Sequence, residues 1–195
     1  LLDVVGKIVG AMCDTQAELK TIYPALPDVI GREVYAVTTA ELEERYPELT
    51  PKERENKVCR EHGTVFIMQI GGALPHSGKP HDGRAPDYDD WSLNGDIMIW
   101  YAPMECALEL SSMGIRVNAE SLRSQLEISG HEERAALPFH RALLDGELPL
   151  TVGGGIGQSR LCMALLAKVH VGEVQCSVWP EDMVKACADA GIALL

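Results

Sequence analysis

The sequence contains no apolar run that approaches the roughly 20 residues needed to cross a bilayer. Basic residues are also scarce, because 17 Lys and Arg stand against 29 Asp and Glu and no stretch concentrates them. The resulting net charge of −12 argues against an extended nucleic-acid-binding surface. We therefore expect neither a membrane nor a nucleic acid as partner. At 195 residues, the chain suits a single domain with a sizeable core.

Paired cysteines are missing as well. The six cysteines are scattered, form no Cys-x-x-Cys motif, and in several cases lie in apolar stretches. This usage predicts buried thiols in a reducing compartment, and hence a cytoplasmic protein. The sequence also begins at Leu1 without an initiator Met or a signal-like leader, so we expect the true N-terminus to lie upstream.

The most informative segment is glycine-rich and runs through residues 153–160, Gly-Gly-Gly-Ile-Gly-Gln-Ser-Arg. It follows an apolar stretch, 148–152, that predicts a short buried strand, and it precedes leucines at helical spacing. Glycines inside a strand indicate a bend or a close approach of another group to the backbone, with a flexible turn as the alternative. A dinucleotide fingerprint lacks its third glycine here, and a P-loop lacks its Lys-Ser/Thr pair.

Other elements follow from periodicity and capping patterns. A long polar loop is expected over 73–95, and its cluster of charged and aromatic residues favours ligand contact over disorder. His76 and His81 lie in this loop without a third ligand at a suitable spacing, so we expect them to be solvated and not to bind a metal. Strands are expected at 33–37, 64–70, 96–101, 105–112 and 171–179. Helices are expected over 1–21, after Thr38 and Thr50 in capping boxes, after Asn118, after Ser129 in another Ser-x-x-Glu box, and after Pro180.

Two acidic residues fall on the expected pair of strands around Ala102-Pro103. If those two residues form the loop, Asp96 lies directly opposite Glu109 on one face of the sheet. Two carboxylates at that spacing need a cation or a raised pKa, and all-oxygen ligands favour Mg²⁺. A loop one residue longer would put them on opposite faces, and a solvated acidic face is the other alternative.

The glycine segment fits Gly-x-Gly-x-Gly-x-x-Arg, which resembles motif 3 of the class II aminoacyl-tRNA synthetase fold. Three further segments precede it in the order found in the asparagine synthetase A family, the ammonia-dependent enzymes. The chain resembles that family over nearly its whole length. The segments are Arg84-Ala-Pro-Asp-Tyr-Asp-Asp-Trp91, Leu93-Asn-Gly-Asp96 and Glu109-Leu-Ser-Ser-Met-Gly-Ile-Arg116.

This resemblance implies an α+β fold, with a class II synthetase-like antiparallel β-sheet flanked by helices. It also implies ATP-dependent synthesis of L-asparagine from L-aspartate and ammonia through a β-aspartyl-adenylate, with release of AMP and diphosphate. Mg²⁺ would be the cofactor, and a homodimer the assembly. Residues 1–195 would form a single catalytic domain, the C-terminal part of such a core, without the upstream motif 1 and motif 2 regions.

The resemblance further implies roles for individual residues. Asp96 and Glu109 would hold Mg²⁺ at ATP, and Arg160 and Glu109 would be catalytic. Asp89 would bind the substrate ammonium, and Arg116, with Ser111 or Ser112, the carboxylate that is not activated. ATP would contact Arg84, Asp96, Glu109, Gly153, Gly155, Gly157 and Arg160.

Two alternatives remain open at the level of sequence. The metal pair, the arginine and the glycine strand are shared with aspartyl- and asparaginyl-tRNA synthetase cores, although the acidic charge and the lack of an anticodon-binding domain argue against that assignment. The other alternative is a non-catalytic paralogue. The presence of Asp96, Glu109, Arg116 and Arg160 together argues against it, since a protein without activity has no physical need for all of them.

Overall fold

The computed structural model describes all 195 residues and contains one five-stranded sheet with the strand order β1-β2-β3-β4-β5. The pair β1–β2 is parallel and the other neighbours are antiparallel. The predicted α+β class is confirmed, with a mixed sheet in place of a wholly antiparallel one. The strands are β1 (Val34–Thr38), β2 (Thr64–Met68), β3 (Asp89–Tyr101), β4 (Cys106–Arg116) and β5 (Val152–Ile156).

Local sequence signals place most of the helices correctly. Thr38 and Thr50 each form the predicted capping box, and the Asn118 side chain caps the next helix, which ends at the left-handed Gly130. None of the helices is long and apolar enough to cross a bilayer. The α-helices are α1 (Leu2–Ile22), α2 (Thr39–Arg45), α3 (Pro51–His62), α4 (Ala119–Ser129), α5 (Pro138–Leu144), α6 (Gln158–Leu165) and α7 (Glu181–Asp189). Three short 3₁₀ turns are η1 (Ala102–Met104), η2 (Glu132–Ala136) and η3 (Val171–Glu173).

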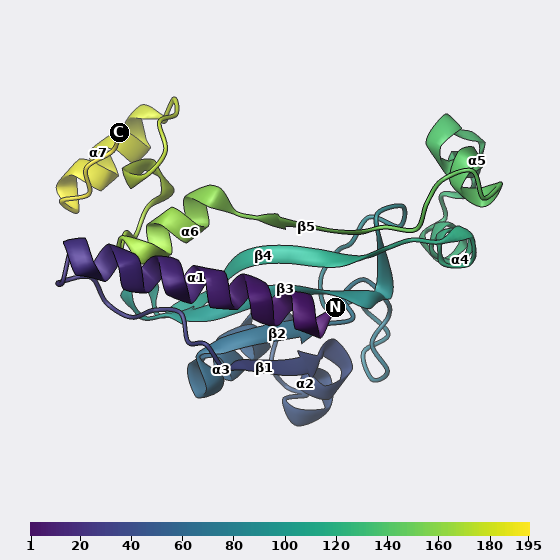
Figure 1. Cartoon of the computed structure of the whole chain (residues 1–195), viewed down its shortest axis with the longest axis horizontal. Helices are drawn as coiled ribbons and strands as arrows, with labels where there is room; N and C mark the ends of the chain where they lie inside the picture. Colours follow the sequence, from purple (N-terminus) through teal and green to yellow (C-terminus); the bar gives the residue numbers. More distant parts are fainter.

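Helix α1 lies across one face of the sheet (Figure 1). Val5, Val9 and Met12 recur at helical spacing on one side of α1 and are buried with Phe66 and Ile97 of the sheet in one apolar cluster, which α6 also joins. Burial of each such side chain stabilises the fold by about 1.5–3 kcal/mol. Helix α1 therefore closes the face of β3 and β4 that carries Ile97.

Helices α2 and α3 cover part of the opposite face. Leu42 of α2 and Val58 of α3 are buried with Ile67 and Met98 in a second apolar cluster. Because side chains alternate along a strand, residues an even number of positions from Met98 point toward this second face wherever the strand is regular. The candidate site is built on the continuation of that face.

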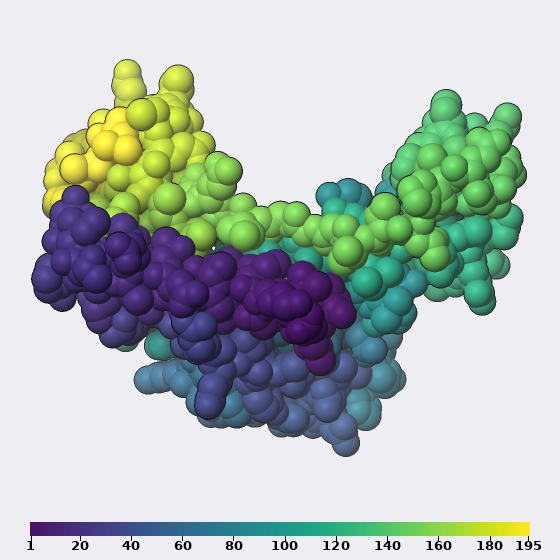
Figure 2. Space-filling view, in the orientation of Figure 1, coloured from purple at the N-terminus to yellow at the C-terminus, as the bar shows by residue number.

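Two helical lobes flank the sheet (Figure 1). The α4–α5 lobe comprises α4, η2 and α5 around a small apolar cluster of its own. The C-terminal lobe comprises α6, η3 and α7 at the other end. The surface is hollowed between the two lobes, with β5 running along the floor of the hollow (Figure 2).

Several predicted elements are wrong. Residues 148–151 are not a strand, and Leu150 is 74% exposed, because β5 is an edge strand that starts only at Val152. Residues 171–179 form η3 and irregular chain, since the Glu173 carboxylate accepts the Val169 and His170 N–H groups and turns the backbone locally. The residues at 129–132 form no capping box, because the Ser129 hydroxyl donates to the Gln125 carbonyl.

The long loop is shorter than predicted, because β3 already begins at Asp89. His81, predicted to be solvated, is buried against Glu55 of α3 with its Nε2 3.3 Å from the carboxylate. The cysteines are all free thiols, as predicted, but they are not all buried. Cys162 and Cys176 are exposed.

Candidate functional site

The register between β3 and β4 decides where the two acidic residues lie. Asp96 pairs with Ser112, and Glu109 pairs with Met98, so the predicted Asp96–Glu109 pairing is wrong. The connection is longer than two residues, since Tyr101 pairs with Cys106, and a bulge interrupts the register between Ile97 and Met98. The loop gains two residues, which preserves the side-chain parity. Glu109, opposite Met98, therefore shares a sheet face with Asp96, as predicted.

Asp96 is a buried carboxylate with a partner. Its carboxylate forms an ion pair with Arg84, whose Nη1 also donates to the Ser112 hydroxyl at 2.8 Å. The pKa of Asp96 is raised to about 6, chiefly because burial disfavours the charged form, with Arg84 opposing the rise and the charge of Glu109 adding to it. The desolvation penalty thus outweighs the contact with arginine. A carboxylate in this state would be stabilised by an additional cation.

Arg160 reaches the same face from the start of α6. Gly157 occupies the N-cap position of α6, and its N–H donates to the Leu110 carbonyl at 2.8 Å, which ties α6 to β4. Arg160 Nη1 then lies 3.2 Å from Glu109 Oε2, and the arginine side chain remains about half exposed. A cavity of about 410 Å³ borders this pair, and Glu109, Gly157 and Arg160 line it together with Gln158 and Ser159.

The donor set fits Mg²⁺ only in part. Asp96 and Glu109 offer carboxylate oxygens, the ligand type that Mg²⁺ prefers. The chain contains no cluster of three or more His, Cys, Asp or Glu side chains with metal-binding geometry. Most of the coordination sphere would then have to come from a phosphate ligand and water, which is the usual arrangement for Mg²⁺ at nucleotides.

A second group of side chains lies toward the far end of β4, around Arg116. Arg116 forms an ion pair with the buried Asp89, donates to the Tyr88 hydroxyl at 3.1 Å, and has its guanidinium carbon 3.8 Å from the centre of the Tyr88 ring. A Cβ on Gly153 would lie 2.3 Å from Arg116 Nη2, and one on Gly114 would lie 2.7 Å from Asp89 Cγ. Both glycines therefore provide the space in which the Arg116–Asp89 pair sits.

The predicted glycine positions thus differ in what they do. Gly155 pairs with Ser112, and a Cβ there would meet nothing within 4 Å, so its surface is open to a ligand. Gly153 pairs with Gly114 and is covered by Arg116, so the absence of a side chain at Gly153 makes room for the arginine. Gly157 lines the cavity beside Arg160, although a Cβ there would contact the Leu110 carbonyl oxygen at 3.5 Å.

The structure brings the predicted site residues onto one face, with one exception. Ser111 pairs with Ile97, on the face closed by α1, and its hydroxyl donates to the Gly155 carbonyl at 2.9 Å. Of the two serines left open by the sequence, only Ser112 faces the site, and its contact is with Arg84 instead of Arg116.

The sequence alone assigns no role to two residues that lie at this site. Tyr88 belongs to the predicted polar loop, and its stacking on Arg116 depends on tertiary structure. Gly114 lies inside the segment 109–116, and a glycine within a strand is a signal for close approach that could have identified it.

Comparison with known proteins gives consistent matches. The profile of the family described as AsnA, Aspartate-ammonia ligase, matches residues 1–191. A curated protein of Limosilactobacillus reuteri named Aspartate--ammonia ligase is 62% identical over 195 residues, covering 100% of this chain and 58% of the relative. One of the same name from Lactobacillus acidophilus is 56% identical over 191 residues, covering 98% of this chain and 57% of the relative. The chain thus spans less than two thirds of the length of these relatives.

Solved structures match at low sequence identity. Aspartyl tRNA synthetase from Entamoeba histolytica aligns with a TM-score of 0.57 and 18% identity, covering 89% of this chain and 39% of that one. Entamoeba histolytica asparaginyl-tRNA synthetase in complex with asparaginyl-adenylate aligns with a TM-score of 0.56 and 14% identity, covering 87% of this chain and 42% of that one. These matches confirm the class II synthetase-like fold.

Proposed function

Because the chain belongs to the aspartate–ammonia ligase family, we propose that the protein joins L-aspartate and ammonia to give L-asparagine, with ATP converted to AMP and diphosphate. The observation that carries the proposal is the single sheet face that holds two kinds of recognition group. Glu109 and Arg160 lie at one end of this face, and Arg116 and Asp89 lie toward the other. A nucleotide and an amino acid can therefore meet on one surface.

ATP is proposed to bind at the Arg160 end. Arg160 is exposed beside the cavity and can stack on a base or contact phosphate, which favours arginine over lysine here. Arg84 is already fixed by Asp96 and Ser112, so its remaining donors can face a phosphate. The open surface at Gly155 allows a ligand to approach the backbone closely.

Mg²⁺ is proposed as the cofactor, held by Asp96 and Glu109 together with phosphate oxygens. When bound, it would neutralise charge on the phosphates of ATP. Its charge would also relieve the penalty that raises the pKa of Asp96. The chain's own contribution is to keep both carboxylates on one face and to hold Arg84 and Arg160 beside them.

Aspartate is proposed to bind at the Arg116 end. Arg116 would hold the carboxylate that does not react, because its planar fork recognises a carboxylate through two parallel hydrogen bonds. Asp89 would receive the substrate ammonium. In the present structure these two side chains pair with each other, so the substrate would enter as a zwitterion that replaces one internal ion pair by two intermolecular pairs. Exchange of this kind avoids leaving a buried charge without a partner.

We propose that the reaction proceeds in two half-reactions. The β-carboxylate oxygen of aspartate attacks the α-phosphorus of ATP, and the bond to diphosphate breaks. Arg84 and Arg160 stabilise the negative charge that develops on the phosphates in this step. Ammonia next attacks the β-carbonyl carbon of the aspartyl-adenylate, AMP leaves with the electrons of the C–O bond, and the nitrogen loses a proton. The product is asparagine.

The test uses the intact protein with ATP, Mg²⁺, L-aspartate and ammonia, without tRNA. We expect asparagine, AMP and diphosphate in equal amounts. Formation of ADP and phosphate would refute the adenylate. Aspartyl-tRNA formation, with no free asparagine at saturating ammonia, would instead identify a tRNA synthetase core. No turnover, together with no binding of ATP or aspartate, would identify a non-catalytic paralogue.

The remaining features of the assembly are also proposals. We propose a cytoplasmic homodimer that requires no nucleic acid partner. The net charge of −12 supports independence from nucleic acid, and the free thiols suit a reducing compartment. Sedimentation of the intact protein, with and without added RNA, would check both the assembly and the absence of a nucleic acid partner.

A further inference from the structure

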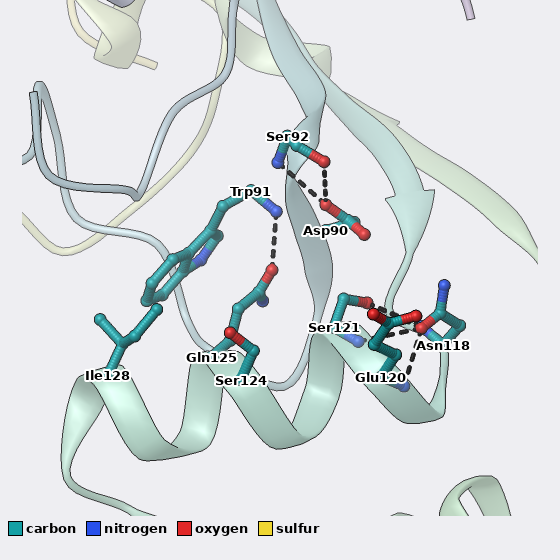
Figure 3. Close-up of a pocket in the computed structure, with 9 residues that line it drawn as sticks. All are labelled: Asp90, Trp91, Ser92, Asn118, Glu120, Ser121, Ser124, Gln125 and Ile128. Carbon is teal, nitrogen blue, oxygen red and sulfur yellow. Dashed lines mark hydrogen bonds between the residues drawn. The ribbon is translucent and has the colours of Figure 1, made fainter.

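Gln125, on the face of α4 that points toward the sheet, is almost completely buried at 4% exposure. Its amide NH₂ group donates to the carbonyls of Pro86 at 2.8 Å and Asp89 at 3.1 Å, and its oxygen accepts the Trp91 N–H at 2.8 Å. Figure 3 shows Gln125 reaching from the helix to the Trp91 amide. Both donors and the acceptor of this one side chain therefore hold the backbone on either side of Asp89.

The segment that Gln125 holds, residues 86–91, carries two of the side chains that contact Arg116. Asp89 pairs with Arg116, and Tyr88 stacks on the same guanidinium. The backbone of this segment is also tied to the end of β4, because Asp89 pairs with Arg116 and the Val117 N–H donates to the Tyr88 carbonyl at 3.1 Å. The α4–α5 lobe adds the Gln125 contacts to this pairing and so helps to set the position of the Asp89 carboxylate over Gly114.

The same lobe also grips the segment through a neighbouring side chain. The Asp87 carboxylate lies 3.0 Å from His140 Nε2 of α5 and 3.1 Å from Arg134 Nη1 of η2. The lobe thus contacts the backbone through Gln125 and the side chain of Asp87 through two further residues. The α4–α5 lobe and residues 86–91 are therefore linked by several hydrogen bonds and ion pairs.

We propose that Gln125 is a positioning residue for aspartate recognition. It fixes the backbone at Asp89, so that the Asp89 carboxylate and the Arg116 guanidinium keep the relative positions needed to bind the ammonium and carboxylate groups of aspartate. It touches neither substrate. This inference rests on the proposed function, because it assigns the Arg116–Asp89 pair to the amino acid.

The chain offers a matched control for a purely structural role. Gln16 of α1 is also buried, at 7% exposure, and also holds a loop by its amide. Its oxygen accepts the Val29 and Ile30 N–H groups at 2.8 and 3.0 Å, and its nitrogen donates to the Ile30 carbonyl at 3.3 Å. That loop contributes nothing to the candidate site. Loss of the amide at either position removes the same kind of backbone clamp.

The experiment compares Gln125→Met with Gln16→Met in the intact protein. We expect Gln125→Met to raise the KM for aspartate about tenfold, because buried backbone groups lose their partners and the charged pair loses its alignment. The KM for ATP should stay within about twofold, because the Arg160 end is not touched. Gln16→Met should lower thermal stability and leave both KM values within about twofold. Equal kinetic behaviour of the two variants, or an equal rise of both KM values in Gln125→Met, would overturn the proposal.

A second variant covers the case in which Gln125→Met does not fold. Gln125→Glu keeps the acceptor for the Trp91 N–H, and when protonated it can still donate to one of the two carbonyls. When ionised it places negative charge against the Asp89 carbonyl. The ratio of its aspartate KM to that of the wild type should therefore rise with pH. A ratio that is independent of pH would count against positioning through Asp89.

Failure of the proposed function has a different signature. If the wild-type protein makes no asparagine, the ligase assignment fails by itself. Hydrogen exchange at the Val117 amide, which donates to the Tyr88 carbonyl, then reads the positioning directly. Faster exchange in the Gln125 variant and not in Gln16→Met supports the clamp, and unchanged exchange refutes it.

Discussion

Replacing Asp96 by Asn should change how the stability of the protein depends on pH. Asp96 is 8% exposed, and its pKa is raised from 3.8 to about 6, chiefly by burial, with Arg84 opposing the rise and Glu109 adding to it. The folded state thus binds this proton more tightly than the unfolded state does. The stability contributed by the group is complete below about pH 4 and is lost as the pH rises through about 6.

A shift of this size corresponds to about 3 kcal/mol between the acid and neutral limits. Asn cannot ionise, and its oxygen can still accept a hydrogen bond from Arg84. The variant should therefore gain stability relative to the wild type as the pH rises from about 4 to about 7, by up to about 3 kcal/mol. Only the change of this stability difference with pH tests the argument, because a difference that is constant with pH can come from changed packing.

Urea unfolding of both proteins at a series of pH values, without nucleotide or Mg²⁺, measures the difference in unfolding free energy. Glu41→Gln serves as a control of opposite sign. The pKa of Glu41 is lowered, chiefly because its carboxylate accepts hydrogen bonds from Thr38, so that variant should lose stability relative to the wild type as the pH rises toward about 5. An Asp96→Asn difference that stays flat between about pH 4 and pH 7 would refute the burial argument.

Four further substitutions test the proposed ligand sites. Arg160→Ala should weaken transition-state stabilisation with ATP by about 1.5–3 kcal/mol with little loss of stability, and unchanged ATP kinetics would exclude the nucleotide role. Gly153→Ala should raise the KM for aspartate, because the added Cβ displaces Arg116. Gly155→Ala should fold normally and change only the KM for ATP, because a Cβ there meets nothing. Equal effects of the two variants on the KM for aspartate would contradict this division. Glu109→Gln should raise the Mg²⁺ concentration needed for half-maximal rate several-fold, and an unchanged requirement would remove Glu109 from the metal site.

The sequence by itself determined the elements whose signals are local. Thr38 and Thr50 cap their helices through residues only three positions away, so no tertiary information is needed to find those starts. The glycine segment followed by Arg160 likewise identifies a strand that leads into a helix. The shared face of Asp96 and Glu109 was predicted as well, but on a two-residue loop that the structure does not have, so the sequence left this point open.

Tertiary structure decided the features that depend on partners far away in the sequence. The Asp96–Ser112 register needed the bulge after Ile97 and the longer loop, and neither has a local sequence signal that fixes it. Residues 148–151 are apolar enough for a buried strand, but they precede an edge strand, and only Leu148 is partly covered, by the α4–α5 lobe.

The use of individual polar side chains was also set by the fold. His81 is buried only because α3 brings Glu55 beside it, and Gly153 is required because Arg116 crosses it from the neighbouring strand. Gln125 looks like any polar residue of an amphipathic helix until α4 packs against the start of β3. A hydrogen-bonding side chain does not encode its partner in the sequence, because the partner is chosen by which backbone groups packing leaves unsatisfied.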